Sequence, residues 1–202
     1  MAETILVTGA SAGFGQAICQ RLVADGHRVI GAARRIEKLQ ALHEELGEAF
    51  YPLQMDVTDL TQVDQALASL PKAWEQIDVL VNNAGLALGL APAQKAEIAD
   101  WLTMIQTNII GLAYLTRQIL PQMVERNDGY VINMGSTAGT VPYPGANVYG
   151  ASKAFVKQFS LNLRADLAGK QIRVTNIEPG LCEGTEFSSV RFKGDEKRVE
   201  AL

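Results

Sequence analysis

The chain has 202 residues, 48% of them hydrophobic and 20% charged, which supplies apolar side chains for one sizeable core and indicates a single domain over residues 1–202. The formal net charge of -4 at pH 7 and the lack of Lys/Arg runs argue against nucleic acid or an anionic membrane surface as a partner, because both attract concentrated positive charge. No apolar run approaches the ~20 residues that cross a bilayer, and the two cysteines fit neither a disulfide framework nor a metal site, so we expect a cytoplasmic protein without a metal ion.

Short β-branched runs alternate with longer amphipathic runs along the chain. The short runs are continuous in apolar residues, as parallel strands covered on both faces tend to be, and they predict strands at TILVT (4–8), HRVIGA (27–32), FYPLQM (50–55), DVLVN (78–82), YVINM (130–134) and IRVTNI (172–177). The amphipathic runs predict helices near 15–25, 36–46, 60–70, 98–126 and 149–168, with C-terminal caps at Gly26, Gly47 and Gly169 and an N-cap at Asp59. Repeated strand-helix-strand units predict a parallel sheet in an α/β sandwich. In the more polar tail from about residue 182, only the last part is expected to form a short helix.

The stretch TGASAGFG (8–15) follows the first predicted strand directly and opens the first predicted helix. Its glycines, Gly9, Gly13 and Gly15, have the spacing G-x-x-x-G-x-G. Positions without a side chain let the backbone turn sharply and let a pyrophosphate approach the helix N-terminus, where unpaired N–H groups and the helix dipole favour negative charge. Glycine also serves ordinary turns, but the strand-turn-helix setting predicts a dinucleotide site.

The end of the second predicted strand indicates which dinucleotide binds. NAD-specific proteins of this architecture usually place an acidic residue there, whereas here Ala33 occupies that position and Arg34 and Arg35 follow. Arginines hold a 2′-phosphate through charge-assisted hydrogen bonds, so NADP is favoured over NAD. The alternative is that both arginines merely open a solvated helix.

Two further motifs end the third and fourth predicted strands: Asp56 with Val57, and NNAG at 82–85. The carboxyl ends of parallel strands border one crevice, so both motifs are expected beside the ligand. The amides of Asn82 and Asn83 can lock loop backbone groups or contact the ribose, or the motif can be simple turn chemistry. Asp56 can hold the adenine end or form an Asx-turn.

The stretch VYGASKAF (148–155) sets Tyr149 and Lys153 four positions apart, on one face of a helix. A free phenol has a pKa of about 10, and a nearby cation lowers that value because it stabilises the phenolate. Tyr149 can then give a proton to a carbonyl oxygen as hydride reaches its carbon, or take the proton of an alcohol in reverse. Lys153 can also bind ribose hydroxyls of the cofactor.

Two more polar residues accompany this pair. Ser136, in INMGSTAG (132–139), follows the fifth predicted strand, where its hydroxyl can share the substrate oxygen with Tyr149; the alternative is an ordinary loop serine. Asn108 lies inside the predicted helix 98–126, an unfavourable place for Asn, so its side chain or a local backbone break can hold a water that links Lys153 to solvent. Alternatively, its amide is satisfied within the helix or at an interface.

In their order and spacing these motifs resemble the short-chain dehydrogenase/reductase family, from residue 4 to about 185: TGASAGFG, NNAG, Asn108, Ser136, YGASK, and PG at 179–180. The resemblance implies a doubly wound Rossmann-type sheet with helices on both faces, hydride transfer to or from nicotinamide, and a catalytic tetrad of Asn108, Ser136, Tyr149 and Lys153. The cofactor-binding residues that we expect are Gly9, Ser11, Gly13, Phe14, Gly15, Arg34, Arg35, Asp56, Val57, Asn83, Ala84, Gly85, Tyr149, Lys153, Pro179 and Gly180.

Within the family, three stretches are most similar to NADP-dependent 3-hydroxy acid dehydrogenases: NNAGLALG, GSTAGTVPYPGANVYGASKAFVKQFSLNLRADL and EPGLCEGTEFSSVRFKGD. This likeness implies NADP(H) as cofactor, a small 3-hydroxy acid such as serine, L-allo-threonine or 3-hydroxypropionate as substrate, and a homotetramer with contacts through the helices near 98–126 and 149–168. It also implies a further helix and a final strand beyond Leu202.

A small hydroxy acid needs a cation for its carboxylate. We expect Arg191 to supply it, with Ser136 and Tyr149 on the reacting oxygen; the alternative is that Arg191 and Lys193 are exposed charges on a mobile loop. Two other functions are kept open. A broad carbonyl reductase or a 3-oxoacyl-carrier reductase would share the tetrad, whereas a non-catalytic NADP-binding regulator would need only the glycine loop.

Overall fold

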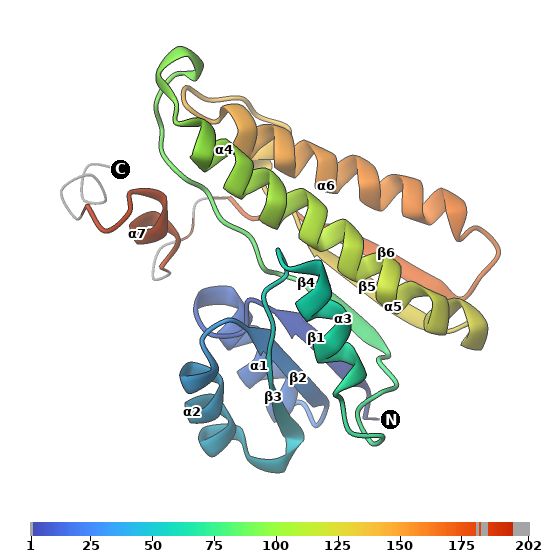
Figure 1. Ribbon diagram of the computed structural model, residues 1–202. Coiled ribbons are helices and arrows are strands. Elements are labelled where there is room, and N and C mark those ends of the chain that lie inside the picture. The colour runs from blue at the N-terminus through green and yellow to red at the C-terminus, as the bar shows by residue number, and fades with distance from the viewer. Residues whose placement is uncertain (1, 181, 183–185, 196–202) are drawn as a thin grey trace.

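Six parallel strands form one sheet in the computed structural model, which describes residues 2–180, 182 and 186–195 (Figure 1). The strands are β1 (Thr4–Thr8), β2 (Arg28–Ala33), β3 (Phe50–Gln54), β4 (Val79–Asn82), β5 (Gly129–Met134) and β6 (Ile172–Ile177). Their order across the sheet is β3-β2-β1-β4-β5-β6. The chain therefore builds outward from β1 on one side and then returns to place β4 on the other. This switch leaves a crevice beyond the carboxyl ends of β1 and β4, where doubly wound sheets bind their ligands.

Helices cover both faces of the sheet. They are α1 (Gly13–Ala24), α2 (Ile36–Leu46), α3 (Leu60–Ala68), α4 (Ile98–Ile105), α5 (Leu112–Arg126), α6 (Asn147–Asp166) and the short α7 (Phe187–Arg191). A π-helical turn, Gln106–Gly111, joins α4 to α5, and single 3-10 turns lie at Gly47–Ala49, Ala93–Lys95 and Thr137–Gly139. In Figure 1 the rod made by α4 and α5 runs alongside α6.

Alternate residues of the central strand β1 serve two hydrophobic cores. Ile5 and Val7 belong to the core that contains Cys19 of α1 and Leu39 of α2, while Leu6 belongs to the core formed with α3, α5 and α6. This division follows from the period of two in a strand, which directs neighbouring side chains to opposite faces. Both faces are apolar and covered, so the strand has no polar alternation and reads as a continuous hydrophobic run.

The predicted three-layer α/β sandwich with a parallel sheet is confirmed, and the strand and helix boundaries agree within a few residues. Asp59 caps α3 as predicted, because its carboxylate accepts a hydrogen bond from the Gln62 amide at 3.0 Å. Two details differ. The predicted helix 98–126 contains the π-helical turn, and the tail contains a helix at Phe187–Arg191 that was not predicted. The short helix predicted for the last part of the tail falls on residues that include 196–202, which lie outside the described part of the chain. None of the helices in the described residues is long and apolar enough to cross a membrane.

Candidate active site

A cavity of about 420 Å³ lies at the carboxyl ends of the strands. Most of the residues predicted to bind the cofactor line it, including the glycine loop, the two arginines after β2, the NNAG motif and the pair Pro179 and Gly180. Ser136, Tyr149, Lys153 and Arg191 line the same cavity. Two predicted residues, Gly15 and Asn108, are not among the lining residues and lie behind its wall. The structure therefore brings the dinucleotide motifs and the proton-transfer residues to one space.

The glycine loop makes room for a phosphate because its backbone folds back on itself. Gly9 and Gly13 have positive φ angles of 68° and 53°, a conformation that residues with a Cβ rarely adopt. A Cβ on Gly15 would lie 2.1 Å from the Gly9 carbonyl oxygen, so this glycine permits a close contact between α1 and the end of β1. Ala12, at the N-cap of α1, contributes no side-chain hydrogen bond to the helix. This arrangement fits a pyrophosphate placed against the helix N-terminus.

Asn83 fastens the NNAG motif to the glycine loop. Its Nδ2 donates to the Thr8 carbonyl oxygen at 2.8 Å, and the backbone amides of Asn83 and Ala84 donate to Thr8 Oγ1 at 3.0 and 2.9 Å. Of the three interpretations of this motif, the structure therefore shows that Asn83 locks loop backbone groups. Asn82 plays a different part, since it is buried and donates to Thr116 Oγ1 and Asn133 Oδ1, both at 2.9 Å.

Asp56 forms the Asx-turn that the sequence left as one alternative. Its Oδ1 accepts hydrogen bonds from the Thr58 amide at 2.9 Å and from Thr58 Oγ1 at 2.8 Å. Its backbone amide donates to the Gln62 side chain. Asp56 and Val57 still line the cavity, so a role beside the adenine end of a dinucleotide stays a prediction.

The two arginines after β2 are not equivalent. Arg34 is exposed, whereas Arg35 lies against the glycine loop and donates from Nε and Nη2 to Ser11 Oγ at 3.2 and 3.1 Å. Arg35 also forms an ion pair of 3.0 Å with Glu186, which in turn pairs with Lys38 at 2.9 Å. Sequence reasoning missed Lys38 and Glu186. The position of Lys38 in the first turn of α2, close to the two arginines, was a signal that could have identified it. Glu186 is far from these cations in the sequence, and no local pattern pointed to it.

Tyr149, in the first turn of α6, is buried, and it lines the cavity together with Ser136. Burial raises the pKa of the Tyr149 phenol above its ordinary value, while the Ser136 hydroxyl and the positive charge of Arg191 both lower it. The pKa of Tyr149 thus reflects a buried phenol within reach of two groups that stabilise its ionised form.

Lys153 is buried one helical turn further along α6, and its Nζ donates to the Met134 carbonyl oxygen at 2.8 Å. Burial lowers its pKa to about 8. Lys153 Nζ turns to this carbonyl and lies 5.9 Å from the centroid of the Tyr149 ring. The effect of Lys153 on the pKa of Tyr149 stays a prediction, and Arg191 is a second cation that acts on this pKa.

Asn108 lies in the π-helical turn and is only 1% exposed. Its Oδ1 accepts from the Leu86 amide at 2.9 Å, and its Nδ2 donates to the Leu86 carbonyl oxygen at 2.8 Å and to Ser152 Oγ at 3.0 Å. The predicted backbone irregularity is present, and the amide is satisfied by the loop and α6 rather than within its own helix. Gly85 separates this amide from Lys153, since a Cβ there would lie 3.4 Å from Asn108 Oδ1 and 3.3 Å from Lys153 Nζ.

Arg191 is 6% exposed, which excludes the alternative of an exposed charge on a loop. Its Nε donates to the Gly89 carbonyl oxygen at 3.3 Å and its Nη2 to the Tyr143 hydroxyl at 2.6 Å. The guanidinium carbon lies 5.4 Å from the centroid of the Tyr149 ring. Lys193 differs, because its side chain is 60% exposed and forms an ion pair of 2.8 Å with Asp100.

Comparison with known proteins agrees with this geometry. Residues 3–196 match the family model described as short chain dehydrogenase. NADP-dependent 3-hydroxy acid dehydrogenase YdfG of Salmonella typhimurium is 63% identical over 195 residues, which cover 96% of this chain and 79% of that protein. Serine 3-dehydrogenase of Rhizobium radiobacter is 54% identical over 202 residues, which cover 100% of this chain and 80% of the relative.

Solved structures give the same result. The closed form of serine dehydrogenase complexed with NADP+ superposes with a TM-score of 0.97 at 60% identity, covering 98% of this chain and 80% of that one. The 3-ketoacyl-(acyl-carrier-protein) reductase of Brucella melitensis complexed with NADH has a TM-score of 0.89 at 26% identity, covering 96% and 81%. The chain belongs to the short-chain dehydrogenase family.

Proposed function

We propose that this protein is an NADP(H)-dependent dehydrogenase that interconverts a small 3-hydroxy acid, such as serine, L-allo-threonine or 3-hydroxypropionate, and the corresponding carbonyl compound. The observation that carries this proposal is the buried guanidinium of Arg191 beside Tyr149 and Ser136 in the cavity of the dinucleotide motifs. A cation at this place can hold the substrate carboxylate while the neighbouring hydroxyls meet its reacting oxygen. Relatives at 54% to 63% identity that are named for these activities support the assignment.

The residues around the cavity suit NADP(H). Gly9, Gly13 and Gly15 leave room for the pyrophosphate, and Ala33 with Arg35 provides a cation instead of an acidic group where the 2′-phosphate would lie. When bound, NADP(H) supplies or accepts the hydride. The other residues proposed to contact it are Ser11, Phe14, Arg34, Asp56, Val57, Asn83, Ala84, Gly85, Tyr149, Lys153, Pro179 and Gly180, all of which line the cavity.

The chain's own residues divide the remaining work. The Tyr149 hydroxyl gives a proton to the carbonyl oxygen in reduction and takes it from the alcohol in oxidation. Ser136, which lines the cavity together with Tyr149, holds the same substrate oxygen. Lys153 orients the ribose through hydrogen bonds. Asn108 is a positioning residue in this proposal, because it fixes the Leu86 backbone against α6.

Oxidation assays test the proposal directly. We expect absorbance at the reduced-nicotinamide band to grow when the protein is mixed with L-serine or 3-hydroxypropionate and NADP, and to grow far less with NAD. Parallel assays in the reducing direction with an acyl thioester and with a simple ketone address the alternatives of a 3-oxoacyl-carrier reductase and a broad carbonyl reductase. Tight NADP binding without turnover of any of these compounds would instead favour a regulator, although the joint presence of Ser136, Tyr149 and Lys153 in the cavity argues against it.

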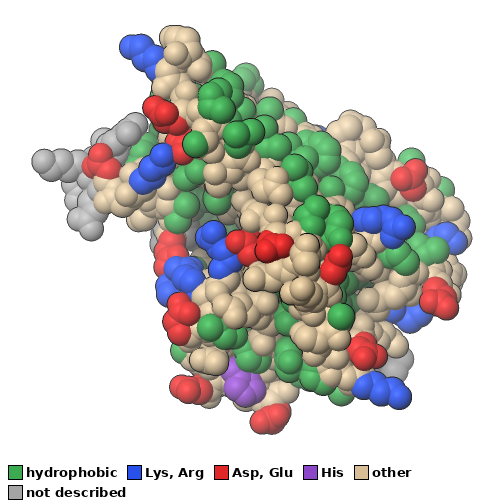
Figure 2. Space-filling model, viewed as in Figure 1, with side chains coloured by type: hydrophobic (Ala, Val, Ile, Leu, Met, Phe, Trp, Pro, Cys, Tyr) green, Lys and Arg blue, Asp and Glu red, His purple; other side chains and the backbone are tan. Residues whose placement is uncertain are grey.

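We also propose a homotetramer assembled through α4, α5 and α6. Large apolar side chains on α4, on the π-helical turn and on α6 are exposed in the single chain, among them Ile98 at 62%, Leu102 at 61% and Leu161 at 45%. Figure 2 shows hydrophobic side chains gathered over α4 and α5. Burial in a subunit interface would remove such a surface from water, and analytical ultracentrifugation tests the assembly.

Two free cysteines in the described residues suit the reducing cytoplasm that we propose as location.

A further inference from the structure

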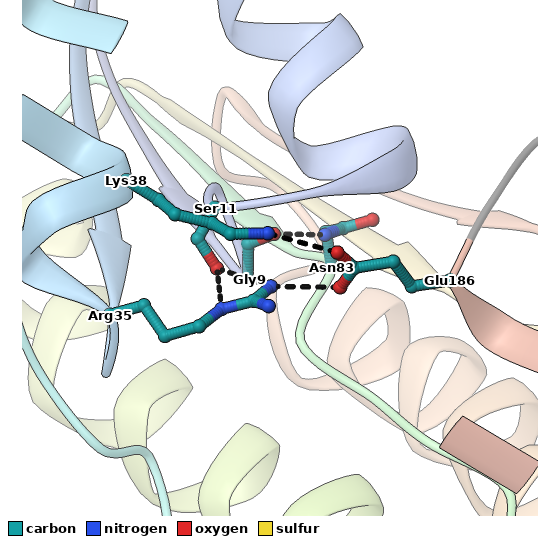
Figure 3. A network of polar contacts seen from close by, with 6 residues as sticks. All are labelled: Gly9, Ser11, Arg35, Lys38, Asn83 and Glu186. Carbon is teal, nitrogen blue, oxygen red and sulfur yellow. Dashed lines mark hydrogen bonds and ion pairs between the residues drawn. The ribbon is translucent and has the colours of Figure 1, made fainter. Parts of the chain in front are cut away.

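A carboxylate of the chain itself pairs with two cations beside the glycine loop of the cavity. Glu186 receives Lys38 Nζ on Oε1 at 2.9 Å and Arg35 Nη2 on Oε2 at 3.0 Å. Arg35 simultaneously donates to Ser11 Oγ in the glycine loop, so that three separate segments of the chain meet at this point (Figure 3). Arg35, Ser11 and Glu186 all line the cavity.

The groups around Glu186 are those that recognise a phosphate monoester. A guanidinium, an ammonium and a hydroxyl together offer several donors with two positive charges, and a phosphate presents three acceptor oxygens with a charge of about -1.5 to -2. Glu186 offers two oxygens and one charge to the same donors. The ion pairs with Lys38 and Arg35 also lower the pKa of the Glu186 carboxyl, so it is ionised at neutral pH.

We propose that Glu186 is an internal competitor for the 2′-phosphate of the dinucleotide and that Lys38, with Arg35 and Ser11, belongs to the site for that phosphate. This inference rests on the proposed use of NADP(H). A phosphate that enters this site displaces Glu186, because two anions at hydrogen-bond distance from the same two cations repel each other. NAD carries a hydroxyl at this position, so it has no need to displace the carboxylate.

Displacement of Glu186 has a defined effect on affinity. A ligand that binds only when the carboxylate has left its cations loses apparent affinity in proportion to the fraction of molecules in which the ion pairs are formed. Glu186 side-chain exposure is 46%, and the pairs are partly solvated, so this fraction is moderate. Glu186 therefore weakens NADP binding without changing NAD binding. It thereby reduces the preference for NADP over NAD that Arg35 creates.

Glu186→Gln tests the proposal, with Glu45→Gln as the matched control. Glu45 is also exposed, lies in α2 and hydrogen-bonds Gln20 at 2.9 Å, so both substitutions remove one negative charge. The ligands are 2′,5′-ADP, which carries the 2′-phosphate, and 5′-AMP, which lacks it, and the dissociation constants are measured by calorimetric titration at low and high salt.

We expect Glu186→Gln to lower the dissociation constant of 2′,5′-ADP about two- to tenfold at low salt, to leave that of 5′-AMP unchanged, and to lose its effect at high salt. Glu45→Gln should change neither. Glu186→Ala should behave like Glu186→Gln, and circular dichroism confirms that each variant is folded.

An unchanged or increased dissociation constant for 2′,5′-ADP in Glu186→Gln would overturn the proposal, because the carboxylate would then coexist with the phosphate or support it. Equal tightening of both ligands would also overturn it, since Glu186 would restrict entry to the cavity without regard to the phosphate. A wild-type protein that binds 2′,5′-ADP no better than 5′-AMP would contradict the proposed cofactor itself, and this outcome is read from the wild type alone.

Discussion

Arg191 of α7 lies with its guanidinium carbon 5.4 Å from the ring centroid of Tyr149 in α6, and its charge opposes part of the rise that burial causes in the pKa of that phenol. The two residues come from segments far apart in the chain and meet on one wall of the cavity. A residue proposed to bind the substrate carboxylate therefore also acts on the residue proposed to move the proton.

Arg191→Met should lower kcat/KM for L-serine by about ten- to a hundredfold, because a hydrogen-bonded charge is worth about 1.5–3 kcal/mol. The loss for an uncharged alcohol should be much smaller, and steady-state assays with both substrates measure the difference. Lys193→Met removes a cation nearby in the same tail, paired with Asp100 on the surface, and should leave both values nearly unchanged. Equal losses for the charged and uncharged substrates would show that Arg191 does not recognise a carboxylate.

Tyr149→Phe should reduce kcat by about a hundredfold or more, the usual contribution of a positioned acid or base. The affinity for NADP should stay near that of the wild type, because the phenyl ring keeps the packing against Phe187. Steady-state assays measure kcat, and fluorescence titration measures the affinity for NADP. Tyr51→Phe, which removes a phenol that packs on Trp74 outside the cavity, serves as the control. Near-normal turnover in Tyr149→Phe would remove Tyr149 from the proton-transfer step.

Arg35→Met should raise the dissociation constant of NADP about tenfold or more and leave that of NAD nearly unchanged. Arg34→Met should have a much smaller effect, because Arg34 is exposed while Arg35 is held against Ser11. Titration of both variants with both dinucleotides separates the two arginines. A larger effect of Arg34→Met would mean that the side chains exchange roles when the cofactor binds.

The lowered pKa of Lys153 predicts a pH dependence of stability. In the unfolded chain the ammonium loses its proton near its ordinary pKa of 10.5, whereas in the folded protein it does so at about 8. Between these values the unfolded state binds more protons, so this residue makes the free energy of unfolding rise with pH from about 8 to about 10. At 1.36 kcal/mol for each pH unit between the two pKa values, the full contribution is about 3 kcal/mol.

Urea unfolding at several pH values in this window, on the wild type and on Lys153→Met, measures that contribution. The difference between the two proteins isolates Lys153, because other groups are common to both. One of them is the buried Cys19 thiol, whose raised pKa of about 12 makes stability fall with pH above 9. A difference that stays constant from pH 7 to pH 10 would show that the Lys153 ammonium titrates alike in both states.

The features that sequence predicts well here are local. Each buried strand is a continuous apolar run, and the glycine loop is recognisable because its conformation depends on residues within it, as the positive φ angles of Gly9 and Gly13 show. The Tyr149 and Lys153 pair was predictable for the same reason, because helix geometry alone places them on one face. Periodicity and turn chemistry are sufficient for such features.

The features that sequence missed depend on contacts between distant segments. The burial of Arg191, its hydrogen bond to Tyr143 and its effect on Tyr149 become visible only when α7 is placed against α6. The same holds for Glu186 and Lys38, which form an ion pair although they are far apart in the chain. A pair of charges carries no local pattern, so only the folded arrangement shows that they are partners.

The hydrogen-bonded amides of Asn82 in β4 and Asn133 in β5 fix how these two strands are aligned. Asn82 and Asn133 are register partners, are buried, and are hydrogen-bonded to each other and to Thr116 and Ser160. A shift of one strand against the other by one residue would leave these buried amides without hydrogen-bond partners among apolar side chains, at a cost of several kcal/mol. The pair thus selects one register between two otherwise apolar strands. It thereby fixes the position at which the chain leaves each strand toward the cavity.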